Sequence, residues 1–375
     1  MSIRAFNNKF NVNSIWMRIH IDPLFMFTMV PLLIYGIIIV WSASNQNIGI
    51  TEKKIIQVIV GLTTMILLAQ LPPKIYEKYA YYLYIICVIL LVVVDVYGQI
   101  SKGSQRWLDL GILRFQPSEI AKIVVPLAIT RFINNDFKPI TIRRIFAALI
   151  FILIPTLLIA IQPDLGTSIL VAISGLLVLF ISGINWKLII ITLFLIILFS
   201  PILWFFLMQD YQRERIIMLL HPNSDPLGAG YHIMQSKIAI GSGGLYGKGF
   251  LLGTQSQLKF LPERHTDFIF AVIAEELGLI GIVFLFLLYL LLIIRGLILA
   301  LRASSSFGCV IISTLILVLF IYIIINVSMV SGVLPVVGIP LPMISYGGSS
   351  LVVLMAGFGI MMSIDTHKKI LSYYI

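Results

Sequence analysis

The sequence predicts an all-α integral membrane protein, a bundle of about ten transmembrane helices with a long outer loop between helices seven and eight. Two observations carry this prediction. Of the 375 residues, 59% are hydrophobic and 11% are charged, whereas a soluble domain has roughly 25% charged residues. Apolar runs close to the roughly 20 residues that cross a bilayer also recur along the chain. Because no linker or internal repeat divides it, we expect one polytopic membrane domain over residues 1–375.

Ten apolar runs are the predicted spans, and they cover residues 24–41, 55–71, 79–97, 118–132, 145–161, 165–181, 188–207, 268–294, 309–329 and 347–364. The fourth run is short and carries Glu119 and Lys122. The first run precedes Ser42, Ala43 and Ser44, which resemble a signal-peptidase site. It is longer than the apolar part of a signal peptide, about 7–15 residues, so we expect it to remain as the first helix.

Basic residues predict the orientation of the bundle. The amino terminus, the even-numbered loops and the tail hold fourteen of them: Arg4, Lys9, Arg18, Lys74, Lys78, Arg131, Lys138, Arg143, Arg144, Lys187, Arg295, Arg302, Lys368 and Lys369. The opposite short loops hold five: Lys53, Lys54, Lys102, Arg106 and Arg114. Because Lys and Arg concentrate in cytoplasmic loops, both termini are predicted to be cytoplasmic. This distribution accounts for the net charge of +10, and we expect no nucleic-acid partner.

Three segments are predicted to lie outside: the loop 98–117, the corner 162–164 and the large loop 209–267, in which residues 231–240 are expected to form a short interfacial helix. The connection 330–346 is rich in Pro and Gly and has no charged residue. It is predicted to be a re-entrant lid, because such backbone enters a membrane only when protein or water covers it. This topology gathers ionisable residues from four regions on the outer face: Arg106, Glu119, Lys122, Asp164 and Asp267.

An ionisable residue inside a span costs about 2.5–3.5 kcal/mol on insertion scales, so Glu119 and Lys122 need a physical reason. The two residues are three positions apart and share one helix face. They either form a local ion pair near the interface, or Lys122 lines a polar cavity and meets an anionic group of a substrate.

Asp164 and Asp267 each have two interpretations as well. Asp164 lies where one span ends and the next begins, so it either caps a helix or has a chemical role. Thr266 is placed to cap the eighth span, which would leave Asp267 in the first helical turn, where the helix dipole favours it. Alternatively, Asp267 is a partly desolvated carboxylate at the mouth of an apolar cavity, which makes it a better general base.

Other polar residues near Asp267 are predicted to be structural. His265 is expected to be a loop residue rather than a metal ligand. Glu275 and Glu276 would lie about 12 Å deeper than Asp267 along a continuous helix, with at least one of them facing the bundle interior. Cys87 and Cys309 both lie in apolar spans and are expected to be small core residues, not parts of a disulfide or metal site.

The glycine-dense stretch 241–249 does not have the spacing of a nucleotide-binding loop. Ser242 stands where a P-loop needs glycine, and Gly249 stands where it needs Ser or Thr. We therefore expect no nucleotide cofactor, and a nest of backbone amides for an anion stays open.

Four blocks of sequence resemble the RodA/FtsW (SEDS) family, in family order and over nearly the whole chain. They are KGSQRWLDLG at 102–111 with FQPSE at 115–119, QPDLGTS at 162–168, LPERHTDFIFA at 261–271 with EELG at 275–278, and GIPLP at 338–342 with SYGGSS at 345–350. The pair Gln105 and Arg106, the residue Arg264 and the short amino terminus resemble the RodA branch of the family.

The resemblance implies a peptidoglycan glycosyltransferase that polymerises lipid II into glycan strands for cell elongation and rod shape. The site would face the outside of the bacterial cytoplasmic membrane. The implied partners are a class B penicillin-binding protein, which is a transpeptidase, and other proteins of the elongation complex. Asp267 matches the essential aspartate of the family and is the predicted catalytic residue. The predicted substrate-binding residues match other cavity positions: Arg106, Glu119, Lys122 and Asp164. A divalent cation, Mg²⁺ or Mn²⁺, with Asp267 as a ligand is left open.

The chemistry fits a single inverting displacement. Asp267 would take a proton from the acceptor sugar's 4-hydroxyl as this oxygen attacks the donor's anomeric carbon. Pyrophosphate is already a good leaving group, so the second carboxylic acid of a glycosidase is not required. Arg106 and Lys122 would place positive charge on the departing phosphates. Two alternatives remain: a lipid II flippase, which predicts polar residues continuing toward the cytoplasm, and a non-enzymatic scaffold, which gives Asp267 no task.

Overall fold

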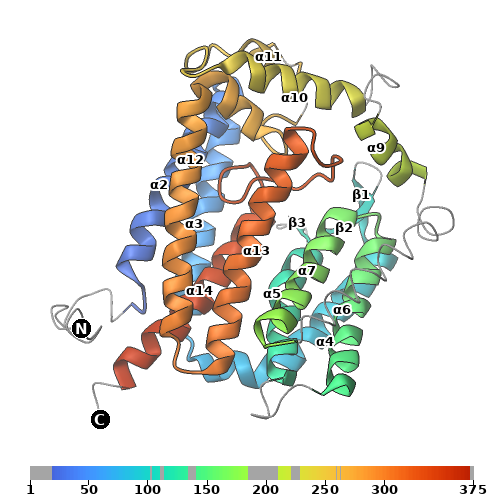
Figure 1. The fold of residues 1–375 in the computed structure, drawn as a ribbon, viewed down its shortest axis with the longest axis vertical. Helices are drawn as coiled ribbons and strands as arrows, with labels where there is room; N and C mark the ends of the chain where they lie inside the picture. The colour runs from blue at the N-terminus through green and yellow to red at the C-terminus, as the bar shows by residue number, and fades with distance from the viewer. Residues whose placement is uncertain are drawn as a thin grey trace.

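The structure is a computed structural model, and it describes residues 19–101, 104–109, 114–133, 141–184, 210–220, 229–258, 260–261 and 263–371. The seventh predicted span, 188–207, lies outside these residues. The other nine predicted spans coincide with helices: α2 (Pro23–Ala43), α3 (Ile48–Gln70), α4 (Pro73–Tyr97), α5 (Pro117–Ile133), α6 (Ile142–Ile161), α7 (Leu165–Ile181), α12 (Ile269–Arg302), α13 (Ser306–Val330) and α14 (Gly348–Leu371). The predicted all-helical membrane bundle is confirmed (Figure 1).

Within the described residues, six of these helices are long and apolar enough to cross a membrane: α2, α4, α6, α12, α13 and α14. Their outward faces keep large apolar side chains exposed at helical spacing, as in Ile85, Ile86 and Ile89 of α4. Water-soluble proteins rarely expose contiguous apolar surface of this kind, whereas lipid covers it without cost. Cys87 is buried in α4 and Cys309 is partly buried in α13, and both are free thiols.

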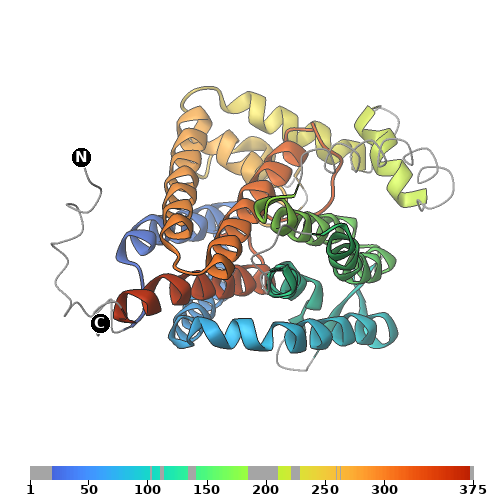
Figure 2. The ribbon, with the colours of Figure 1, turned by 60° about the horizontal axis from the view of Figure 1, so that its bottom comes forward.

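The helices pack as two groups joined by α13. One apolar cluster lies mainly among α2, α3, α12, α13 and α14, and a second lies among α4, α5, α6 and α7. Helix α14 lies between α3 and α13 (Figure 2), and α13 also contacts α5, α7 and α12. A side chain on the inner face of α13 can therefore meet residues from both groups.

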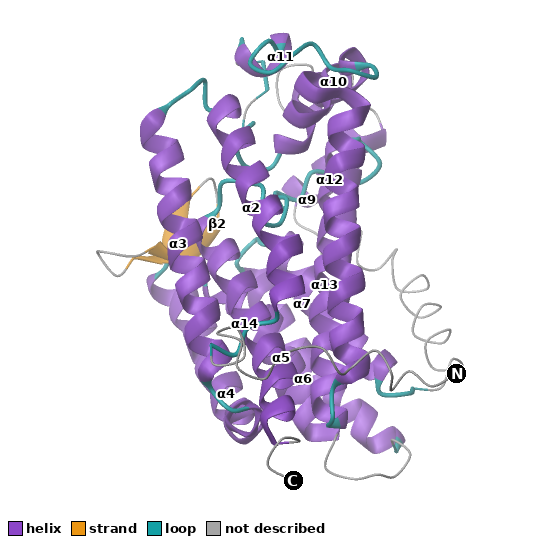
Figure 3. Ribbon diagram, turned by 90° about the vertical axis from the view of Figure 1, so that its left-hand side faces the viewer, coloured by secondary structure: helices purple, strands orange, loops and turns teal. Residues whose placement is uncertain are grey.

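The loop 98–117 forms a small antiparallel sheet that the sequence did not predict. Its strands are β1 (Gln99–Ser101), β2 (Ser104–Asp109) and β3 (Arg114–Phe115), in the order β1-β2-β3. Strands of two to six residues are too short to show a clear alternation of apolar and polar residues. Strand β2, which holds Arg106, packs against α4 and α5. The sheet lies beside the helices in Figure 3.

The large loop contributes α9 (Asp210–Leu220), α10 (Ala229–Gly243) and α11 (Thr254–Gln257). Helix α10 confirms the helix predicted over 231–240. Helices α10 and α11 lie at one end of the bundle, which we call the α11 end (Figure 1). The start of α2, the end of α14 and the turn between α12 and α13 lie at the opposite end.

Helix α12 is broken at Gly278, so one prediction is wrong. Gly278 has φ 64° and ψ −159°, a conformation that non-glycine residues rarely adopt. Glu275 and Glu276 precede this break, in the short helical piece 269–277, and so lie outside the long membrane helix that follows it. Both are fully buried at the α11 end, where Glu275 accepts hydrogen bonds from Gln255 N at 2.8 Å and Ser256 N at 3.0 Å.

The connection between α13 and α14 has no helix or strand. Val333 and Leu334 at its start are exposed, whereas Ile339, Leu341, Met343 and Ile344 are buried. Its second part is thus enclosed by protein, as non-helical backbone at membrane depth must be. Whether this connection acts as a lid over the outer cavity stays a prediction.

The orientation of the bundle can be tested with single cysteines. Tyr246 in the α11-end loop is 80% exposed, and Ser304 lies exposed in the turn between α12 and α13. We expect Tyr246→Cys to react with an impermeant maleimide in intact spheroplasts, and Ser304→Cys to react only after the membrane is opened. Both are placed in a background with Cys87 and Cys309 replaced by alanine. Labelling of both positions in intact cells contradicts the orientation.

Candidate active site

The side chain of Asp164 caps a helix and also forms an ion pair. Its Oδ1 accepts a hydrogen bond from Thr167 N at 3.3 Å and so caps α7. Its Oδ2 accepts from Gln116 Nε2 at 3.0 Å, and Arg106 Nη1 lies 3.5 Å from Oδ1. Arg106 Nη2 also donates to the carbonyl of Pro163 at 2.7 Å. The two interpretations of Asp164 are therefore compatible, because one side chain caps a helix and holds a cation.

Lys122 and Glu119 form the predicted ion pair on α5. Lys122 Nζ lies 2.7 Å from Glu119 Oε2, and both side chains are buried. The same ammonium lies 3.5 Å from the hydroxyl of Tyr322 and 4.6 Å from the centre of its ring. The ion pair is thus part of a larger polar group that reaches α13.

Asp267 lies in a turn before α12, and the capping interpretation is wrong. Helix α12 starts at Ile269, and no side chain caps it. Thr266 Oγ1 instead donates to the carbonyl of Glu263 at 3.1 Å, which closes the turn on itself. Asp267 is half-buried, and its carbonyl accepts from Asn326 Nδ2 at 3.0 Å.

Tyr322 connects the predicted site residues. Its side chain is buried in α13 beside Lys122, and Asn326, one turn later on the same helix, donates to the carbonyl of Asp267. Arg106 and Lys122 join through their ion pairs with Asp164 and Glu119. The structure therefore brings all five predicted residues into one neighbourhood, although they come from a strand, a helix and two turns.

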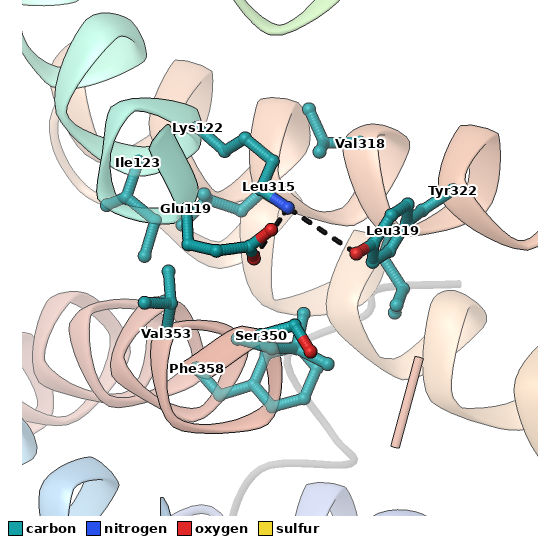
Figure 4. A pocket seen from close by; sticks show the side chains of 12 residues that line it. Glu119, Lys122, Ile123, Leu315, Val318, Leu319, Tyr322, Ser350, Val353 and Phe358 are labelled. Atoms are coloured by element: carbon teal, nitrogen blue, oxygen red, sulfur yellow. Dashed lines mark hydrogen bonds and ion pairs between the residues drawn. The ribbon is translucent and has the colours of Figure 1, made fainter. Parts of the chain in front are cut away.

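A pocket opens beside this group between α5, α13 and α14. Figure 4 shows Glu119 and Lys122 facing Tyr322 at one part of the pocket. The remaining wall is almost entirely apolar and includes Leu315, Val318, Leu319, Val353, Leu354 and Phe358. A ligand that fits this pocket has a charged part and a hydrocarbon part.

Three residues of this site had no role predicted from the sequence: Gln116, Tyr322 and Asn326. Gln116 was part of a recognised block but received no role. Tyr322 and Asn326 are polar residues in an apolar run, and that feature was the available signal. Gln116 contacts Asp164, Tyr322 contacts Lys122, and Asn326 contacts the carbonyl of Asp267, so these three residues link the predicted ones.

His265 lies in the turn before α12, as predicted for a loop residue, and the glycine-dense stretch packs against the backbone of α12. The ring of His265 packs edge-on against Tyr346, with centroids 5.8 Å apart. At Gly247, with φ 77°, a Cβ would lie 2.1 Å from the carbonyl oxygen of Glu276. The next two amides donate to the carbonyls of Glu275 and Glu276. These amides are therefore occupied by protein, which disfavours the anion nest.

Comparison with known proteins shows the family. The family model of FtsW, RodA and SpoVE, described as a cell cycle protein, matches residues 23–370. This chain belongs to that family. It is 63% identical over 362 residues to the peptidoglycan glycosyltransferase MrdB of Escherichia coli K12, across 96% of this chain and 98% of the relative. It is also 33% identical to a probable peptidoglycan glycosyltransferase FtsW of Geobacter metallireducens, across 93% of this chain and 95% of the relative.

Solved structures of family members share the fold. A chain from work on the structural coordination of polymerization and crosslinking by a peptidoglycan synthase complex superposes with a TM-score of 0.82 and 31% identity, covering 92% of this chain and 98% of that chain. The rod shape determining protein RodA of Thermus thermophilus gives a TM-score of 0.70 and 28% identity, covering 92% and 96%. The RodA/FtsW assignment made from the sequence blocks is confirmed.

Proposed function

We propose that this family member polymerises lipid II by inverting displacement of undecaprenyl pyrophosphate, with Asp267 as the general base. The enzyme class, peptidoglycan glycosyltransferase, is that of its 63%-identical relative. One observation carries the mechanism. Asn326 donates to the carbonyl of the half-buried Asp267, and Tyr322, one turn earlier on α13, faces Lys122, which is ion-paired with Glu119. The Asp267 turn and the Lys122 ammonium therefore meet the same stretch of α13, which suits a base and a cation that act on one lipid pyrophosphate.

The apolar pocket supports a lipid-linked donor. Below the Glu119–Lys122 pair, its wall is formed by Leu315, Val318 and Phe358 among others. A polyprenyl chain buries hydrocarbon there at roughly 25 cal/mol per Å², while its phosphates stay beside the charged residues. The charged part of the pocket therefore suits the pyrophosphate, and the apolar part suits the polyprenyl chain attached to it.

A divalent cation fits the site if it is coordinated jointly by the protein and the substrate phosphates, rather than by protein side chains alone. Among the described residues, no group of three or more His, Cys, Asp or Glu could hold a metal ion. Mg²⁺ commonly takes one or two carboxylates together with substrate phosphates, and Asp267 supplies a carboxylate of this kind. When bound, Mg²⁺ or Mn²⁺ would supply positive charge to the leaving phosphates.

The structure gives weaker support to the alternatives. A flippase needs a polar path through the bundle, whereas the described wall of the pocket becomes apolar away from Lys122. A scaffold does not require the ion pairs Arg106–Asp164 and Lys122–Glu119. The partner we propose is a class B penicillin-binding protein, since a related chain comes from work on a synthase complex that couples polymerization to crosslinking.

The test uses the purified protein with lipid II, alone and with its transpeptidase partner, with and without EDTA. We expect glycan polymer on a gel. With the protein inserted in vesicles in one orientation, we expect the polymer to form on the side that corresponds to the outer face of the membrane. Transport of lipid II across the vesicle membrane with no polymer formed would favour the flippase. Polymer that is insensitive to EDTA would remove the cation from the mechanism.

The Arg106→Lys variant is expected to retain only part of the lipid II turnover of the unmodified protein. Arg106 uses Nη1 and Nη2 on Asp164 and Pro163, while its buried Nε has no hydrogen-bond partner among the described residues. Lysine keeps the charge but lacks the planar fork. A lost charged hydrogen bond, about 1.5–3 kcal/mol, lowers turnover roughly 10- to 150-fold. The control is Arg131→Lys, in the ion pair with Glu77. Equal, full activity of both variants would leave Arg106 with a structural role.

A further inference from the structure

Lys54 is a buried lysine without a carboxylate partner. It lies in the second turn of α3, and its side chain is 0% exposed. Its Nζ donates to two backbone carbonyls, Ser345 O at 2.7 Å and Met343 O at 3.1 Å. No carboxylate lies within ion-pair distance of it among the residues that the structure describes. Its neighbour Lys53 is exposed.

A buried ammonium that meets only carbonyls needs a reason, because desolvation of a charge is compensated poorly by neutral acceptors. An apolar residue at this position would pack against the bundle without that cost. What lysine adds is a fixed pair of hydrogen bonds to one short piece of chain. The two carbonyls belong to the connection between α13 and α14, which has no secondary structure of its own.

The same piece of chain holds the Asp267 turn. Ser345 Oγ donates to Thr266 O at 2.6 Å, and Tyr346 N donates to His265 O at 2.8 Å. Ser345 Oγ also accepts from Leu341 N at 2.7 Å, which fixes the position of its hydroxyl. A chain of contacts therefore leads from Lys54 through Ser345 to the residue next to Asp267.

Two further contacts place Asp267 against this connection. Asn326 Nδ2 donates both to Asp267 O at 3.0 Å and to Ile339 O at 2.6 Å. A Cβ added at Gly338 would lie 3.6 Å from Asp267 Oδ2. The wall behind the Asp267 carboxylate is thus the 338–346 backbone, and Lys54 is the side chain of α3 that donates hydrogen bonds to this wall.

We propose that Lys54 is a positioning residue for Asp267. It fixes the carbonyls of Met343 and Ser345, so that Ser345 and Tyr346 hold the 265–266 backbone and, with it, the Asp267 carboxylate at the site. The proposal rests on the proposed role of Asp267 for its kinetic consequence, whereas the placement of residue 267 is independent of that role. It concerns a residue that touches neither substrate nor reacting atoms.

The kinetic test compares Lys54→Met and Lys54→Arg with the exposed neighbour change Lys53→Met. Misplacement of a reacting group by about 1 Å costs up to roughly 100-fold in rate. We therefore expect Lys54→Met to lower kcat for lipid II roughly 10- to 100-fold per folded enzyme, with KM changed less than about 3-fold. Lys53→Met should match the unmodified protein. A Lys54→Met enzyme with unchanged kcat overturns the proposal.

A double-variant cycle with Ser345→Ala tests the route. Because both residues act through one chain of contacts, Lys54→Met and Ser345→Ala together should cost no more than the larger single effect. Multiplying losses would mean that the two residues act separately and would overturn the proposed route. If Lys54→Met does not insert, Lys54→Arg takes its place in the cycle.

A placement readout separates this proposal from the proposed function. In Asp267→Cys protein, we measure the rate of labelling by a small maleimide with and without Lys54→Met, using Lys53→Met as the control. A rate altered about 3-fold or more by Lys54→Met alone supports the positioning role, even if Asp267→Asn proves active and the base assignment fails. An unaltered labelling rate overturns the positioning role, even if Asp267 is the base.

Discussion

Asp267→Asn is expected to lower the rate of lipid II polymerisation at least about 100-fold, because general-base catalysis contributes roughly 10²- to 10⁴-fold. Asparagine keeps the size of the side chain and cannot accept the proton of the attacking hydroxyl. Asp267 is half-buried in the 263–268 turn, and that turn is held by backbone contacts rather than by its carboxylate alone. We therefore expect insertion and folding to be retained.

The measurement is initial polymer formation at matched amounts of folded protein, with thermal unfolding in detergent as the check on folding. Glu52→Gln is the control, since Glu52 is an exposed carboxylate on α3. Near-normal output from folded Asp267→Asn protein would remove Asp267 from the chemistry. Binding of lipid II should persist, because the apolar pocket and the two ion pairs remain.

The Glu119–Lys122 pair gives the second large effect. A structural pair predicts that Lys122→Met and Glu119→Gln each lose activity and that the two together restore it, since the 2.7 Å contact is then replaced by two neutral groups. We expect no rescue. Lys122 Nζ also faces Tyr322 and the pocket, so its charge is available to the pyrophosphate. Its loss should lower turnover roughly 10- to 150-fold.

The experiment is lipid II turnover for both single variants and the double variant at matched membrane levels. Lys78→Met serves as a control, because Lys78 contacts only the exposed ring of Tyr79 among the described residues. Full recovery in the double variant would show that Lys122 serves the fold and not the substrate. A double variant as slow as Lys122→Met would support direct use of the ammonium.

The sequence predicted the membrane helices well because hydropathy is a property of each run of residues. Helix α12 was mispredicted because its break depends on Gly278, and a glycine in an apolar run gives no sign of its φ. The Thr266 cap was also wrong, since the side chain found an acceptor in Glu263 within its own turn. Local sequence shows that a residue such as Thr266 is able to cap a helix, and the tertiary contacts determine whether it does.

The site residues were predicted for a different reason. Arg106, Asp164 and Asp267 stand in blocks that resemble a family, and Lys122 follows one of them by three positions, so their assignment needed no knowledge of the packing. Tyr322 lies outside those blocks, and its role appears only when α13 is seen beside α5 and the Asp267 turn. Lys54 was counted as a loop residue from its charge, whereas the structure buries it completely.

The contact between Lys54 and Met343 joins residues separated by 289 positions in the chain. During synthesis, α3 enters the membrane long before the carbonyls that receive its lysine have been made. The Asp267 turn also precedes the backbone that will hold it. The catalytic geometry is therefore completed by the last part of the chain to leave the ribosome. A site assembled in this order is not complete until nearly all of the helices are in the bilayer.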